Sequence, residues 1–129
     1  MRPLLFAVLL IACGSSGTEP QLGENIEIRL GATIEIPDDT TRVQFTDVTS
    51  DSRCPTGAQC VWAGEAVALF TVGGSQQVSL TLGADASRAT VIVRDKQFTI
   101  VALKPYPKLN ETIAKGDYIA TIRFTSAKN

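Results

Sequence analysis

The chain contains no histidine. This absence excludes the Ser–His and Cys–His pairs of nucleophilic hydrolases, together with any imidazole acid or base. The only cysteines are Cys13, Cys54 and Cys60, and two thiolates alone do not complete a tetrahedral zinc site. The sequence also lacks a phosphate-cradling glycine loop. We therefore expect no metal and no cofactor, and we expect that the protein is not an enzyme.

A concentrated positive surface is also missing. Lysine and arginine number 12 against 13 acidic residues, for a formal net charge of −1, and no basic cluster stands out. A nucleic-acid partner is therefore not expected.

The carboxylates show no spacing that marks an acid–base pair. Asp47, Asp51 and Glu65 are the candidates for glycosidase chemistry, but surface roles are the simpler interpretation. Asp38 and Asp39 fall in an expected loop that lacks the spacing of an EF-hand calcium site.

Long apolar runs are scarce. The uncharged run at residues 4–11 is shorter than the 20 or so residues that a membrane-spanning helix needs, and with Arg2 before it the run fits an export signal. The sequence Leu10-Ile11-Ala12-Cys13 then resembles the lipobox of bacterial lipoproteins, in which the cysteine receives a diacylglycerol and becomes the new N-terminus. This resemblance implies a signal peptide at residues 1–12, a lipidated Cys13 with a flexible tether at residues 13–24, and a β domain at residues 25–129.

The same resemblance implies a location. A diacylglyceryl cysteine, with a further acyl chain such as palmitate, would hold the protein on a membrane almost permanently, because two or more chains anchor far better than one. Gly14 follows the cysteine where an acidic residue would signal retention at the inner membrane. We therefore expect a lipid-anchored protein of the bacterial cell envelope, on the outer membrane and facing the periplasm or the surface.

Lipidation of Cys13 would leave Cys54 and Cys60 as a pair in an oxidising compartment. We predict a disulfide between them. The loop that it closes is short, and the bridge should contribute about 2 kcal/mol to stability.

Apolar and polar residues alternate along most of the chain after residue 24, which is the pattern of strands with one buried face. The expected strands cover residues 26–30, 34–36, 43–45, 66–72, 78–82, 90–93, 98–102 and 118–124. Gly31 predicts a bulge or bend in a continuing strand, Gly73-Gly74 a tight hairpin, and Asp95-Lys96 the tip of another. At most one helical turn is expected, over residues 109–115. About seven or eight short strands indicate an all-β fold, first a small antiparallel β-sandwich and alternatively a small β-barrel.

The densest segment is residues 51–66, which hold the cysteine pair and the only tryptophan. In one interpretation it is a recognition surface with Arg53, Trp62 and Glu65 as contact residues. In the other, which we favour from sequence, it is a structural plug in which Asp51, Arg53 and Glu65 pair with each other or with backbone amides and Trp62 covers the core at one end. Gly64 predicts a close approach by another part of the chain.

This segment carries a second resemblance. The pattern Asp51-Ser52-Arg53-Cys54-Pro55, four residues, Cys60, one residue, Trp62, one residue, Gly64 resembles a signature of small secreted bacterial proteins and lipoproteins whose activity is uncharacterised. Pro105-Tyr106-Pro107 and Asp117-Tyr118 are similar to the C-terminal part of that group. The resemblance covers residues 26–125 and implies no particular activity.

Three functions are therefore considered. The first is a membrane-anchored, non-catalytic β domain that binds an envelope protein or glycan or has a structural role there. The second is an inhibitor of a protease or lysozyme that uses the disulfide-pinned loop, at residues 56–59, as a rigid wedge. The third is a small-ligand carrier, which a hollow barrel would allow, although the large apolar inward residues are enough to fill a small barrel.

Overall fold

A computed structural model describes residues 20–127, and it confirms the all-β prediction. Eight strands form two antiparallel four-stranded sheets that face each other and are not closed into a barrel. The sandwich prediction is thus confirmed and the alternative of a small barrel is wrong. The expected signal peptide at residues 1–12, the lipidation of Cys13 and most of the expected tether lie outside the described residues. No helix among residues 20–127 is long and apolar enough to cross a bilayer.

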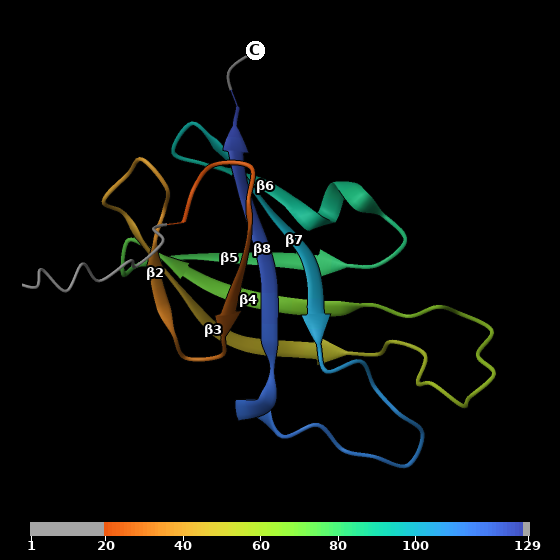
Figure 1. Cartoon of the computed structure of the whole chain (residues 1–129). Helices are drawn as coiled ribbons and strands as arrows, with labels where there is room; N and C mark the ends of the chain where they lie inside the picture. The colour runs from red at the N-terminus through yellow and green to blue at the C-terminus, as the bar shows by residue number, and fades with distance from the viewer. Residues whose placement is uncertain (1–19, 128–129) are drawn as a thin grey trace, which may run out of the picture.

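The two sheets divide the strands as Figure 1 shows. The first sheet has the order β1 (Asn25–Arg29), β8 (Ile119–Ser126), β7 (Lys96–Lys104), β6 (Thr90–Val93). The second sheet has the order β2 (Thr33–Glu35), β3 (Arg42–Asp51), β4 (Ala66–Val72), β5 (Gln76–Leu82). Two short 3-10 helices, η1 (Ala86–Ala89) and η2 (Lys115–Asp117), complete the described elements. The helical turn expected at residues 109–115 is wrong except at its last residue.

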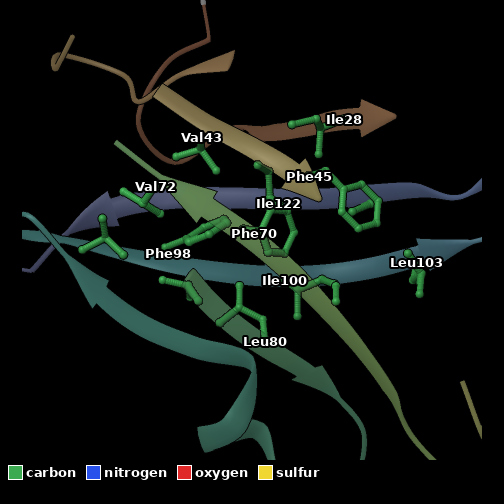
Figure 2. Close-up of a cluster of buried hydrophobic side chains, with 14 of the residues drawn as sticks. Ile28, Val43, Phe45, Phe70, Val72, Leu80, Phe98, Ile100, Leu103 and Ile122 are labelled. Atoms are coloured by element: carbon green, nitrogen blue, oxygen red, sulfur yellow. The ribbon is translucent and has the colours of Figure 1, made fainter. Parts of the chain in front are cut away.

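The core follows from the period-2 alternation, which sends the apolar residues of each strand toward the opposite sheet. Four fully buried phenylalanines meet at its centre, Phe45, Phe70, Phe98 and Phe124. The first pair stacks with ring centroids 5.1 Å apart, the middle pair meets edge to face at 4.9 Å, and the last pair stacks at 4.7 Å. Phe45, Phe70 and Phe98 are labelled among the aliphatic core residues in Figure 2. The space between the sheets is thus filled by side chains, which weakens the ligand-carrier hypothesis.

Gly31 marks the point where the chain changes sheets. We expected a bend within one continuing strand, but β1 pairs with β8 in the first sheet while β2 pairs with β3 in the second. Gly31 takes a left-handed φ of +91° and donates its N–H to the Phe45 carbonyl at 2.7 Å. The alternation of apolar residues continues across Gly31 because both strands face the same core, and for this reason the sequence pattern conceals the change of sheet.

The molecule has two distinct ends. At one end lie the two tight hairpins, β4–β5 and β6–β7, and the described chain also begins there (Figure 1). Gly73 and Gly74 turn the first hairpin with φ values of +63° and +82°, as predicted, and Arg94-Asp95 form the tip of the second, one residue earlier than predicted. At the other end lie the long loops that follow β3 and β7. We call these the hairpin end and the loop end.

Candidate recognition site

The predicted disulfide between Cys54 and Cys60 is present in the loop after β3. It joins two cysteines six positions apart in sequence, with their Cα atoms 5.9 Å apart. We call residues 54–64 the recognition loop and residues 105–118 the supporting loop. Both leave the same end of the sandwich, the first in yellow-green and the second in blue in Figure 1.

Arg53 lies beneath the recognition loop and is only 7% exposed. Its Nε donates to Asp51 Oδ1 at 2.8 Å and its Nη2 donates to Asp51 Oδ2 at 2.7 Å, which makes a bidentate ion pair. The same guanidinium donates to the carbonyl of Leu103 at 2.6 Å and to that of Pro105 at 3.1 Å. The contact role considered for Arg53 is therefore wrong, because its donors are used internally to join the end of β3 to the end of β7.

Tyr118 is the third member of the buried cluster that Asp51 and Arg53 form. Its hydroxyl donates to Asp51 Oδ2 at 2.9 Å. Burial and this hydrogen bond to a carboxylate raise the pKa of Tyr118 to about 12. Burial alone would raise the pKa of Asp51, but the hydrogen bonds from Arg53 and Tyr118 outweigh it and hold that pKa below its usual range. Asp51 is thus ionised and fully used as an acceptor.

The supporting loop fixes the recognition loop by further bonds. The Tyr106 hydroxyl donates to the Cys54 carbonyl at 2.8 Å, and its ring centroid lies 5.2 Å from the Arg53 guanidinium carbon. Thr56 donates its N–H to Pro107 at 2.9 Å and accepts the N–H of Leu109 at 3.1 Å, in a short parallel bridge. The two loops therefore form one rigid unit, although they are about fifty residues apart in sequence.

Gly64 closes the base of the recognition loop, and the predicted close approach is confirmed. A Cβ at this position would lie 1.8 Å from the backbone oxygen of Ser52, and the glycine has a φ of +72°. Ser52 also donates its N–H to the Glu65 carbonyl at 2.7 Å. Only a residue without a side chain lets the two ends of the loop come this close.

Glu65 does not belong to the cluster of Asp51 and Arg53. It pairs with Arg88 of η1, with Oε2 2.7 Å and Oε1 3.3 Å from the two guanidinium nitrogens. The internal pairing that the plug interpretation gave to Glu65 is therefore corrected. Glu65 directly precedes β4, and Arg88 belongs to η1, which follows β5, the strand that pairs with β4.

Trp62 is 81% exposed and Val61 is 93% exposed. The plug interpretation, in which Trp62 covers the core, is therefore wrong for this residue. The chain bends at both positions between the bridge at Cys60 and the clamped Gly64, so the tip of the loop stands clear of the sheets. Within residues 20–127 the indole N–H forms no hydrogen bond.

Two more exposed apolar side chains belong to the supporting loop. Tyr106 is 51% exposed and Leu109 is 49% exposed. Leu109 lies beside the recognition loop, since its Cβ is 3.6 Å from the position that a Cβ of Gly57 would occupy. Sequence reasoning missed both residues, because Pro105-Tyr106-Pro107 was considered only as part of a resemblance and Leu109 only as the start of an expected helical turn. The one sequence feature that could have indicated an exposed side chain here is the aromatic residue Tyr106 between two prolines.

The three carboxylates considered for glycosidase chemistry are each paired with a different cation. Asp51 pairs with Arg53 and Glu65 with Arg88, while Lys115 donates to Asp47 Oδ1 at 2.7 Å and lowers the pKa of that carboxyl. Among residues 20–127 no three metal-ligating side chains come together.

Comparisons with protein-family models, with curated proteins and with solved structures find no match to this chain. The function must therefore be inferred from the geometry of the loops.

Proposed function

We propose that this chain is a membrane-anchored lipoprotein of the bacterial cell envelope whose β domain binds a partner through the recognition loop, without catalysis. The observation that carries the proposal is the exposure of Val61 and Trp62 on a loop that is held from several sides. A small protein leaves a tryptophan this exposed at a cost in solubility, and exposed apolar clusters mark interaction sites.

The rigidity of the loop supports a binding role. The disulfide, the buried Arg53 and the bridge between Thr56 and Leu109 fix the backbone before any partner arrives, so little conformational entropy remains to be lost on binding. Tryptophan is also among the residues most enriched at binding hot spots.

The loop also carries no charge. Residues 54–64 contain no Asp, Glu, Lys or Arg, and the charged residues that flank them are used internally. The partner surface should therefore be uncharged where it meets the loop, and affinity should come from apolar burial and neutral hydrogen bonds.

The topology supports an orientation in which the recognition loop of an anchored domain faces away from the membrane. The described chain begins at the hairpin end, opposite the recognition loop (Figure 1). A tether from a lipidated Cys13 would then leave the recognition loop directed away from the anchoring bilayer, which we propose is the outer membrane. An envelope protein or glycan is the class of partner within reach.

A photo-crosslinking amino acid placed at Val61 tests the proposal in intact cells. We expect one dominant cross-linked envelope partner, whose affinity for the purified protein falls at least ten-fold in Trp62→Ala. Ile92→Ala is the matched control, because Ile92 is 56% exposed on β6, away from the recognition loop. Equal affinities of both variants and the wild type would sink the binding role of this loop.

The anchor is tested separately. Mass spectrometry of the exported protein should find a diacylglyceryl group on Cys13, and Cys13→Ser should release the protein from the membrane fraction. An unmodified Cys13 would refute the lipoprotein assignment but would leave the recognition loop intact.

A second candidate, inhibition of a protease or lysozyme, is favoured by the same rigid loop. Thr56 is held against the supporting loop, so the projecting wedge would be residues 61–62 and not residues 56–59 as expected from sequence. A hydrolase panel discriminates between the two: inhibition that is lost in Trp62→Ala supports this candidate, and no inhibition of any enzyme rejects it.

A further inference from the structure

A polar groove lies at the hairpin end, away from the recognition loop. Its volume is about 550 Å³, which falls within the range of small-molecule sites. Thr33, Gln44 and Thr71 form a row across β2, β3 and β4 on the outer face of the second sheet, and they line one wall. These side chains offer hydroxyl and amide groups to a ligand.

Two arginines complete the groove. Arg42 begins β3, and Arg94 reaches the groove from the tip of the β6–β7 hairpin in the other sheet. Arg94 Nε donates to the hydroxyl of Thr41 at 3.1 Å, and Thr41 is only 8% exposed. The buried threonine therefore positions Arg94, and the two Nη groups of Arg94 remain available. The Arg42 guanidinium forms no hydrogen bond or ion pair within the described part of the chain.

The two acidic residues near the groove, Asp39 and Glu35, are not among the residues that line it. Asp39 Oδ1 accepts both the N–H and the hydroxyl of Thr41 at 2.8 Å, and these bonds, together with the charges of Arg94 and Lys96, lower the pKa of Asp39, whose side chain does not line the groove. Glu35 lies opposite Arg42 in the register of β2 and β3 but lines a neighbouring hollow. Within residues 20–127, no acidic side chain lines the groove itself. Two guanidiniums without a carboxylate are an arrangement suited to an oxyanion.

We propose that this groove binds a phosphate-type oxyanion carried by a hydroxylated molecule, either a sugar phosphate or the headgroup of a phospholipid. Arg42 and Arg94 would hold the oxyanion, and the row of Thr33, Gln44 and Thr71 would hydrogen-bond the hydroxyl groups beside it. The volume exceeds that of a single phosphate and leaves room for a sugar ring or a glycerol. The site is independent of the recognition loop and of the proposed binding function.

Isothermal titration calorimetry of the full-length protein in a non-ionic detergent tests the proposal. The probes are glucose 6-phosphate, glycerol phosphate and inorganic phosphate, with glucose as the neutral comparison. We expect the two organic phosphates to bind, glucose not to bind, and the dissociation constants to rise at least about ten-fold in Arg42→Gln and in Arg94→Gln, since each removes a charge-assisted contact. Added salt should weaken binding.

Arg29→Gln is the matched control, since Arg29 is an exposed arginine at the far end of β1. It should bind as the wild type does, and all three variants should unfold at the wild-type midpoint. Tighter binding of glucose 6-phosphate supports a saccharide source and tighter binding of glycerol phosphate a lipid source. No binding of any phosphate, or binding that both groove variants retain, overturns the proposal.

Discussion

Arg53 and Trp62 have the opposite exposure to the one that their residue types suggest, since arginine is usually exposed and tryptophan is usually buried. The charged residue is buried and the aromatic residue is exposed. The partners of Arg53 are the carbonyls of Leu103 and Pro105, which lie about fifty positions away in sequence. The pairing of Arg53 with Asp51 agrees with the plug interpretation, but no local pattern reports carbonyls so distant in sequence, so these two partners could not be predicted. Gly64 was predictable because a glycine within a strand-like pattern already indicates close backbone contact.

Gly64→Ala should destabilise the protein by about 3 kcal/mol or more, because the added methyl overlaps the Ser52 carbonyl at a left-handed φ. Urea unfolding measures the loss. Gly74→Ala is the matched control: its φ is also positive at +82°, but nothing lies within 4 Å of the new Cβ, so about 1 kcal/mol is expected. Equal losses in the two variants would show that backbone overlap is not the reason for glycine at position 64.

At the scale of elements, strands were easier to predict than loops. Alternation located the main strands of both sheets because burial of one face imposes a period of two on the residues themselves. The same alternation does not say which sheet a strand joins, and so the change of sheet at Gly31 was missed. Part of the contact between the recognition loop and the supporting loop consists of backbone hydrogen bonds at Thr56, and any residue except proline can donate such a bond, so the sequence gives no sign of it.

Cys54→Ala should lower the free energy of unfolding by about 2 kcal/mol under oxidising conditions, because the unfolded chain loses its cross-link. Under reducing conditions the wild type loses the same constraint, so the difference between the two proteins should nearly vanish. Denaturant unfolding with and without a reductant provides both values. A difference that persists in the reductant would mean that the cysteine contributes by packing and not through the bridge.

For the whole molecule, the buried cluster of Asp51, Arg53 and Tyr118 links stability to pH. An unfolded tyrosine titrates near pH 10, whereas Tyr118 in the fold titrates at about 12. Between these values the unfolded chain releases a proton that the folded chain retains, so unfolding becomes easier as the pH rises. Asp51 acts in the opposite direction: its lowered pKa adds stability at neutral pH that is lost as the pH falls through that value.

Thermal unfolding at a series of pH values tests this linkage. The wild type should lose stability progressively between about pH 10 and about pH 12, and Tyr118→Phe should lack that part of the decline. Tyr106→Phe is the matched control, because the Tyr106 hydroxyl bonds to a backbone carbonyl and not to a carboxylate. The same alkaline decline in both variants would contradict a role for Tyr118.

The position of β8 has a consequence for how the polypeptide is made. This last described strand lies between β1 and β7, so it bridges the beginning of the chain to the rest of the first sheet. Until the ribosome has synthesised residues 119–126, β1 has no neighbour to pair with and the core lacks Ile122 and Phe124. The first sheet therefore cannot be completed during synthesis until the last described strand is present, whereas the second sheet contains only strands that are made earlier.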